Sequence, residues 1–552
     1  MPLETIPSEI LQLIINQLVI SVGIYKAVRL RSVNKAFNSA ILDAICFDRV
    51  IDIKDPALPK LARRMPVSLK GRYLLRKSSS DKVDGTASRL AIASLNQVLD
   101  DMTKASGEQQ IEQHRRIAEA VAHRYPRSPD DPWWICGTKP EISEQDILSG
   151  AVVLGNIQLV KTILEKRSPA FADIDKESSY IGRPLQVAAA WGHIHLVRYL
   201  LENGANPHLH HVDIDWWSEP PIRSWPDPTL IRPDDGSALR AAILGPHEDV
   251  IQLLLQPEYR ISSSKVEYGR LIVAACQIGR LDLIQTLIEA TGKTMHDFPC
   301  LVEEMMWIAV YHGQCCIVEM LLDSGVDVNI KTVPYSREDC SDPLTIAARG
   351  GSPRMVRLLL ERGANVEGLP IADAAFRGHI EVVELLLAHG ASPVKAFLFA
   401  ADGGQIRLLK WLSTRDSDLH LKPWDGCLGV PIPIGIEALH KAILIKNPAI
   451  ISWLVDLGVR LDASGMNGTY EFPRRFKRWG ANWIKERKFP AFSARKFSAD
   501  WIVELLLSLG AEDPEEPWRI RKDVYPEKII QKQPTRGGVR ITKRTWEWVG
   551  KD

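Results

Sequence analysis

Three stretches of the sequence decide the fold: RPLQVAAAWGHIHLVRYLLENGANP at 183–207, DPLTIAARGGSPRMVRLLLERGANV at 342–366 and LPIADAAFRGHIEVVELLLAHGASP at 369–393. Each contains a small pair such as Ala-Ala, then a glycine, then an apolar run with Leu-Leu, and then a second glycine followed by alanine. Because several independent features keep the same phase, the stretches indicate a structural repeat.

Weaker copies of this pattern occur from about 145 to 512. The first glycine of each copy, or the residue in its place, serves as a marker that we call the phase position, and the markers recur at a spacing scattered around about 33 residues. The phase positions are 155, 192, 246, 279, 313, 351, 378, 404 and 446. The pattern predicts about ten degenerate repeats over 144–513, with insertions near 207–235 and 465–497.

The residue types in one copy explain why it should form two packed helices. The small pair Ala347 and Ala348 lets a short first helix lie close to its neighbours. Val356 and Leu359 recur at helical spacing, which places them on one buried stripe of a second helix. Gly363 supplies the left-handed residue that closes that helix. One such unit cannot cover its own apolar face, so neighbouring units must stack.

This repeat resembles the ankyrin family over about two thirds of the chain, although the family's Thr-Pro-Leu-His opening is never intact. The resemblance implies an all-α, ankyrin-repeat solenoid made of helix-turn-helix units with connecting turns. It also implies a concave face of turns and short helices that binds a protein. Aromatic and arginine side chains dominate interface energetics. We therefore predict that the partner contacts the residues just before the phase positions, namely Trp191, Tyr311, Arg349 and Arg377.

The amino-terminal segment 3–47 shows apolar residues at helical spacing in three successive stretches, which predicts a small three-helix unit. A unit of this size buries little surface alone and should complete its core against a partner. The segment resembles an F-box, although it begins with Ile-Pro where the family usually has Leu-Pro. The resemblance implies docking on the Skp adaptor of an SCF-type (cullin) ubiquitin ligase through Ile6, Pro7, Ile10, Leu11, Ile14, Leu18, Val33 and Phe37.

An alternative interpretation is that this segment is a cap for the solenoid or a vestigial module, because terminal repeats need caps. The distance of about a hundred residues to the first repeat favours the F-box-like unit, since a cap needs no such spacer. We therefore predict four regions: an F-box-like unit at 1–50, a helical and flexible connector at 51–143, the repeat array at 144–513 and a basic tail at 514–552.

Composition and charge limit the other function classes. Lysine and arginine number 69 against 68 acidic residues, so the net charge of +1 creates no whole-chain field for nucleic acid or an anionic membrane. Residues 470–500 are locally basic with interleaved aromatic residues, and 519–552 are basic as well. This favours an acidic or phosphorylated protein partner near the carboxyl end, with solvated charge and single-stranded nucleic acid as alternatives.

Motifs for catalysis, metal binding or membrane insertion are missing from the sequence. It contains no phosphate loop, no His-Glu-x-x-His and no Gly-x-Ser-x-Gly, so we expect no enzyme activity and no cofactor. The eight cysteines include no zinc-type pair and are expected to be reduced. A cluster of imidazoles and carboxylates could suit a transition metal, but an exposed polar turn explains it better; its members are His208, His210, His211, Asp213 and Asp215. We expect a cytoplasmic or nuclear protein.

The function that these observations favour is an adaptor. The F-box-like unit would hold the chain to a ubiquitin ligase, and the ankyrin face would capture the protein to be modified, so the chain would act by proximity. The combination is similar to large fungal F-box and ankyrin proteins. The alternative is a ligase-independent scaffold or regulatory protein, with a nuclear location as one option.

Overall fold

A computed structural model describes residues 87–124, 142–165, 173–209, 236–261, 266–331, 342–425, 431–461, 500–511, 532–535 and 538–541, with isolated positions between 12 and 75 and between 490 and 494. The chain divides into two compact units, which we describe separately. The first contains residues 1–317 and 333–339, and the second contains 318–332 and 340–552.

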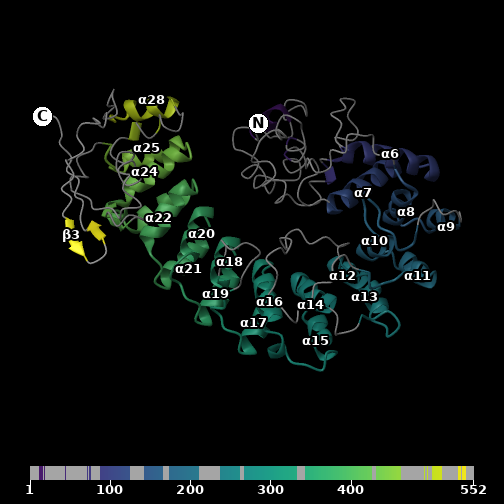
Figure 1. Ribbon diagram of the computed structural model, residues 1–552. Helices are drawn as coiled ribbons and strands as arrows, with labels where there is room; N and C mark the ends of the chain where they lie inside the picture. The colour runs from purple at the N-terminus through teal and green to yellow at the C-terminus, as the bar shows by residue number, and fades with distance from the viewer. Residues whose placement is uncertain are drawn as a thin grey trace. The chain divides into compact units, whose positions relative to one another are not determined.

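The first unit is built of paired helices that run antiparallel (Figure 1). Helices α6 (Ala87–Thr103) and α7 (Glu108–Arg124) precede the pairs and pack on α8. In each pair the first helix packs against the first helix of the next pair, from α8 through α16. The pairs are α8 (Glu144–Val153) with α9 (Ile157–Glu165), α10 (Pro184–Ala190) with α11 (Ile194–Glu202), α12 (Ala238–Leu244) with α13 (Glu248–Leu254), and α14 (Val266–Ile278) with α15 (Leu281–Glu289), followed by the 3-10 turn η5 (Met295–Asp297) and α16 (Pro299–Tyr311).

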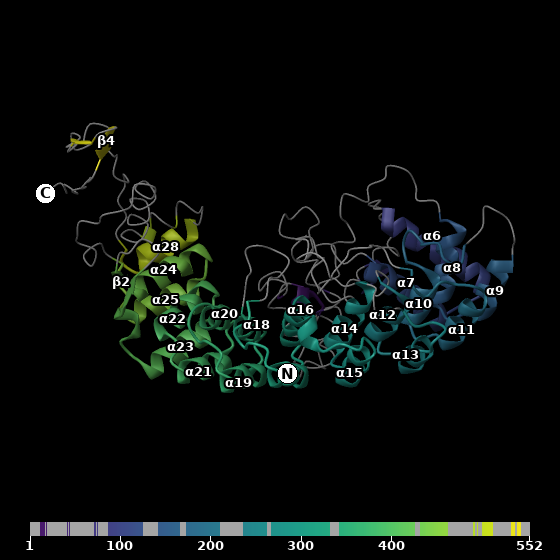
Figure 2. The same ribbon diagram turned by 60° about the horizontal axis from the view of Figure 1, so that its bottom comes forward.

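The second unit repeats this arrangement, with its first helices in one row and its second helices in another (Figure 2). Helix α17 (Cys315–Asp323) spans the division between the units. The pairs of the second unit are α18 (Pro343–Gly350) with α19 (Pro353–Glu361), α20 (Pro370–Arg377) with α21 (Ile380–Ala388), α22 (Pro393–Asp402) with α23 (Ile406–Arg415), and α24 (Ile434–Leu444) with α25 (Pro448–Asp456). Helix α28 (Asp500–Ser508) follows.

Two short antiparallel strand pairs, which the sequence did not predict, also belong to the second unit. Strand β1 (Pro423–Asp425) pairs with β2 (Pro431–Pro433) between the 3-10 turn η6 (Leu419–Leu421) and α24, with Trp424 opposite Ile432. Strand β3 (Lys532–Thr535) pairs with β4 (Gly538–Ile541). The runs are three and four residues long and three of the four contain proline, so no period-2 pattern marks them in the sequence.

The core of each unit lies between its two rows of helices. The small pair of every repeat is buried, as at Ala188 and Ala189 in the first unit and at Ala374 and Ala375 in the second. The apolar stripe of the second helix faces the same core, and Val356 and Leu359 have no exposed surface. The prediction of an all-α solenoid of stacked helix pairs is therefore confirmed.

Backbone angles confirm the repeat phase at all nine phase positions. The glycines there have φ between 69° and 81°, and the two positions without glycine, Pro246 and Lys446, also have positive φ, of 24° and 55°. The glycine that closes the second helix has φ near 90° in several repeats, for example 91° at Gly204. Glycine recurs at these places because left-handed backbone is strained for other residues.

Part of what the sequence predicted lies outside the described residues. Among the predicted adaptor contacts, only Ile14 and Leu18 are described, and Ile6, Pro7, Ile10, Leu11, Val33 and Phe37 are not. Of the suggested metal cluster only His208 is described. The regional boundaries at 50, 143 and 513 stay predictions. In the described part of the chain, no helix is both long and apolar enough to cross a bilayer.

Candidate protein-interaction surface

A clamp between adjacent repeats fixes the end of several first helices, among them α10 and α20, where the predicted contact residues Trp191 and Arg377 lie. The clamp is the residue after a phase position, which reaches back to a carbonyl in the preceding repeat. His193 Nε2 lies 3.1 Å from the Val153 carbonyl oxygen, and His247 Nε2 lies 2.9 Å from that of Ala190. Glutamine does the same elsewhere, since Gln314 Nε2 donates to the Gln277 carbonyl at 3.0 Å.

Glycine at the phase position makes room for this clamp. A Cβ atom on Gly155 would lie 2.9 Å from His193 Cε1, and one on Gly192 would overlap the ring of His247. Burial lowers the pKa of His193, which its hydrogen bond to the Val153 carbonyl partly opposes. The neutral imidazole with its proton on Nε2 therefore donates this bond. His193 and His247 therefore have a structural role between repeats.

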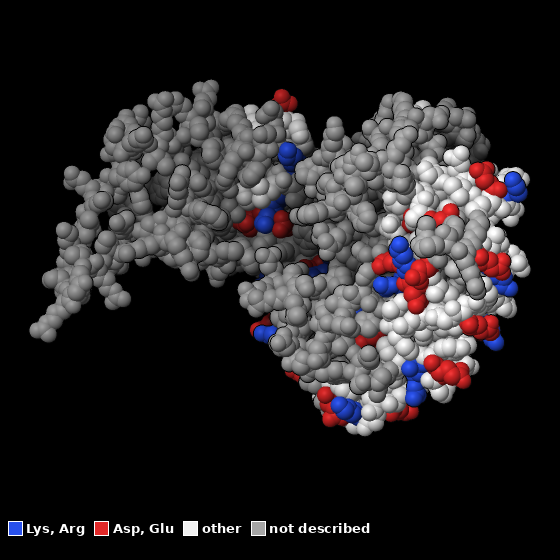
Figure 3. All heavy atoms as spheres, turned by 45° about the vertical axis from the view of Figure 1, so that its right-hand side comes forward, with Lys and Arg blue, Asp and Glu red and all other residues white. Residues whose placement is uncertain are grey.

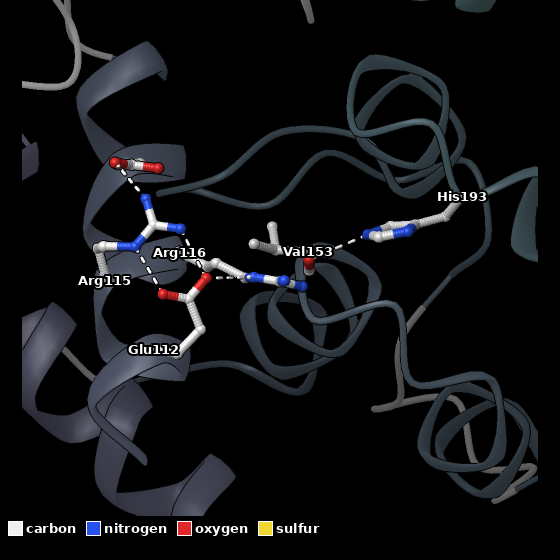
Figure 4. A network of polar contacts seen from close by, with 6 residues as sticks. Glu112, Arg115, Arg116, Val153 and His193 are labelled. Carbon is white, nitrogen blue, oxygen red and sulfur yellow. Dashed lines mark hydrogen bonds and ion pairs between the residues drawn. The ribbon is translucent and has the colours of Figure 1, made fainter. Parts of the chain in front are cut away.

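An ion-pair network on α7 and the His193 ring lie on opposite sides of Val153, the last residue of α8 (Figure 4). Arg115 contacts the carboxylates of Glu112 and Glu119, each at 2.6 Å, and Arg116 Nε donates to Glu112 at 3.0 Å. The hydrogen bond from Arg115 lowers the pKa of Glu112 to about 2. The network orients the exposed face of α7 and so positions Glu119 at the cavity described next.

Trp191 lines a cavity of about 330 Å³ in the first unit. It stands at the carboxyl end of α10, and the apolar wall includes Val187 and Leu244. Helix α7 contributes Glu119 and His123, and the clamp residue His247 completes the lining. The lining combines an aromatic residue and aliphatic walls with a few polar groups, as ligand pockets do.

Tyr311 is also accessible, with 46% of its surface exposed at the end of α16. Its ring stacks on that of Trp307, one turn earlier, with centroids 5.2 Å apart and an interplanar angle of 11°. The ring of His312 meets Tyr311 edge-on, and burial lowers the pKa of that histidine. The structure therefore places a rigid aromatic pair where the sequence predicted a single tyrosine.

The two predicted arginines belong to the second unit and differ from the aromatic residues in their environment. Arg349 Nη2 and Nε both lie 2.9 Å from Asp373 Oδ2 of the next repeat. Arg377 is half-buried and has its own partners, while its neighbour Phe376 is 46% exposed. Arg349 therefore has a structural role between repeats, in addition to any contact with a partner.

Sequence reasoning missed Glu119 and His123 of α7, Trp307 and Phe376. Trp307 could have been found because it lies four residues before Tyr311, and Phe376 because it is adjacent to Arg377. The α7 residues carry no such signal, because only the packing of α7 on α8 brings them to the cavity. No group of three or more metal-ligating side chains occurs among the residues that the structure describes.

On the face shown in Figure 3, acidic and basic side chains of the described residues are interspersed, with no region of one sign. This agrees with the near-zero net charge of the chain. The two locally basic segments predicted to favour an acidic partner lie largely outside the described residues. This face therefore offers a partner local charged groups and no broad field of one sign.

Comparisons with known proteins identify the repeat. A family model for three ankyrin repeats matches residues 305–396, and a model for one ankyrin repeat matches 183–211. The chain is 27% identical over 203 residues to the ankyrin repeat and KH domain-containing protein CBG24701 of Caenorhabditis briggsae, across 35% of this chain and 7% of that protein. It is 25% identical over 175 residues to the probable E3 ubiquitin-protein ligase XBOS32 of Oryza sativa subsp. japonica, across 31% and 34% of the two chains.

Among solved structures, the human ASB11 ankyrin repeat domain matches 38% of this chain and 84% of that chain, at 24% identity and a TM-score of 0.27. The chain covers well under two thirds of the length of the two relatives named above. The fold, the repeat phase and the family models together define the class: the chain contains ankyrin repeats.

Proposed function

We propose that the chain is an adaptor that holds a protein substrate on its ankyrin repeats and docks the Skp adaptor of an SCF-type ubiquitin ligase through its amino-terminal segment. The order of residues Ile6-Pro7, Val33-Asn34-Lys35 and Phe37 supports the docking half. The chain would work by raising the local concentration of substrate near the ligase, which supplies the chemistry. Such a role fits the cytoplasm or the nucleus.

Exposure in the amino-terminal segment supports this proposal. Leu13 and Ile14 are 65% and 50% exposed, while Ile15 is fully buried. Two adjacent exposed aliphatic side chains on a small helical unit provide an apolar surface that a partner can cover. The rice relative, whose name describes a probable E3 ubiquitin ligase, adds a second line of support.

The packing of α6 and α7 also bears on the alternative that the segment is only a cap. Both helices pack on α8, and a Cβ atom on Gly150 of α8 would lie 3.0 Å from Leu99 of α6. The amino-terminal end of the repeat stack is therefore already covered by α6 and α7. A second cap from residues 1–50 is not needed, which favours a role in partner binding for that segment.

A direct binding measurement tests the proposal. Purified Skp adaptor is titrated with the full chain and with an Ile14→Asp, Leu18→Asp variant, which puts charge into the proposed apolar contact. Ile111→Asp is the matched control, because Ile111 is an isoleucine on α7 that is 65% exposed, more than Ile14. We expect the control to bind like the natural chain and the double variant to lose binding. If the folded natural chain does not bind the Skp adaptor, the chain is a ligase-independent scaffold.

A further inference from the structure

The exposed face of α16 carries three residues in a row. Glu303, Trp307 and Tyr311 are four residues apart, so they lie on one face of the helix at successive turns. The residues between them, such as Met306 and Val310, are buried except for the half-buried Glu304. We call this row the α16 stripe. It belongs to the first-helix row of the first unit, the same row that contains Trp191.

The aromatic part of the stripe is held in place by its own stacking. Trp307 and Tyr311 are nearly parallel at 5.2 Å, and the edge of His312 supports Tyr311 at the same centroid distance. Two stacked rings present a negative π surface with little side-chain entropy left to lose on binding. A guanidinium or ammonium group is the side-chain chemistry that such a surface attracts.

Glu303 supplies the charge at the other end of the stripe. Its carboxylate makes no ion pair or hydrogen bond among the residues that the structure describes. The side chain is half-buried, and this burial raises the pKa of Glu303 above its usual value. A carboxylate that has lost part of its water without gaining a cation is stabilised when a partner brings one.

Two acidic groups on the first helices of the second unit, Asp373 and Asp402, offer no such opportunity. Asp373 is paired with Arg349 at 2.9 Å, and Asp402 is paired with Lys441 at 3.1 Å. An incoming cation would have to displace an existing pair there, whereas at Glu303 it would add a new one. An anionic partner, including nucleic acid, would meet an unfavourable charge on the α16 stripe.

We propose that the α16 stripe binds an arginine or lysine side chain of a basic segment in the protein partner, with the cation over the Trp307–Tyr311 rings and against the Glu303 carboxylate. This inference rests on the proposed function in one respect, since it names the chemistry of the protein that the ankyrin repeats hold. It does not depend on the Skp adaptor. Failure of either experiment therefore leaves the other informative.

The test uses a phage library of random peptides selected on the full chain. We expect arginine or lysine to be enriched in the selected peptides. We expect them to bind the Glu303→Gln variant about two- to fivefold more weakly, as for a partly exposed ion pair. Tyr311→Ala should weaken binding about fivefold or more through loss of the cation–π contact. Glu361→Gln is the matched control, because Glu361 is an exposed glutamate on the second helix α19.

A charge reversal makes the test decisive even if one variant is poorly folded. Selection on Glu303→Lys should exclude basic peptides and enrich acidic ones, while thermal unfolding checks that the variant is folded. Selected peptides without basic residues would overturn the proposal. So would basic peptides that bind Glu303→Gln and Tyr311→Ala as tightly as they bind the Glu361→Gln control.

Discussion

Replacement of Gly192 by alanine should destabilise the repeat stack by more than its backbone strain alone. Gly192 has φ 71°, in the left-handed region, where a side chain costs about 1–2 kcal/mol. Its Cβ would also overlap the ring of His247, which must then move. That movement breaks the hydrogen bond of 2.9 Å between His247 Nε2 and the Ala190 carbonyl.

Gly204 in the same repeat separates these two effects. Its φ is 91°, but a Cβ atom there would meet nothing within 4 Å. Gly204→Ala should therefore cost only the backbone term, about 1–2 kcal/mol. Gly192→Ala should cost about 1 kcal/mol more, the net value of one hydrogen bond, for a total of about 2–3 kcal/mol. The difference in stability between the two variants therefore measures the contribution of the His247 clamp.

Urea unfolding followed by circular dichroism gives the difference in stability. Amide hydrogen exchange of α10 to α13 gives the local effect, because repeat stacks do not always unfold in one step. A Gly192→Ala, His247→Ala double variant should cost less than the sum of the single variants, since removal of the ring removes the overlap. The reasoning would be refuted if Gly192→Ala destabilised the chain no more than Gly204→Ala does, or if the double variant were additive.

Three further predictions concern single side chains. Because burial lowers the pKa of His193 from 6.5, its stabilising contribution is complete above pH 6.5 and is lost as the pH falls through the lowered pKa. Unfolding measured at several pH values should therefore show that the His193→Gln variant loses less stability at acidic pH than the natural chain does. Part of the loss should remain in the variant, because burial also lowers the pKa of His312. Lys446→Gly should raise the free energy of unfolding by about 0.5–1 kcal/mol by relieving φ 55°, and a lower midpoint in urea would contradict this. Arg349→Ala should change the free energy of unfolding by less than about 1 kcal/mol, since the pair with Asp373 is about one-third exposed. A larger loss of stability in urea unfolding would mean that the pair is coupled to the core.

The sequence predicted the fold because each repeat carries its structural signals locally. Small pairs, apolar stripes and phase glycines specify one helix pair each, and all of these signals lie within one repeat length. Even the irregular spacing did no harm, because Lys446 keeps a positive φ at a phase position where other copies have glycine. The stack imposes the turn there, so the phase could be followed where the marker residue is absent.

The candidate site could be predicted only in part, because its geometry depends on packing between repeats. Position alone identified Trp191 and Tyr311 as accessible residues of the first-helix row. It did not reveal that α7 forms one wall of the Trp191 cavity, or that Tyr311 stacks on Trp307. It also treated Arg349 as a contact residue, although the guanidinium has an acceptor, Asp373, in the next repeat.

At seven of the nine phase positions, the residue that follows explains how the repeats are coupled. Long side chains with a donor reach back to the preceding repeat, and short polar ones cap their own second helix instead. The first group contains His193, His247, Gln314 and Gln405, each bonded to a carbonyl two residues before the preceding phase position. The second group contains Asn156, Ser352 and Asn447, each accepting from a backbone N–H three residues later.

Reach is the physical reason for this division. A serine or asparagine oxygen extends far enough to satisfy an N–H in the first turn of its own helix, but it cannot extend across the turn of the preceding repeat. A histidine or glutamine can, and it then satisfies a carbonyl that the end of the first helix leaves without an intrahelical partner. Clamped junctions should therefore open together in hydrogen exchange, while junctions that begin with serine or asparagine should open more independently.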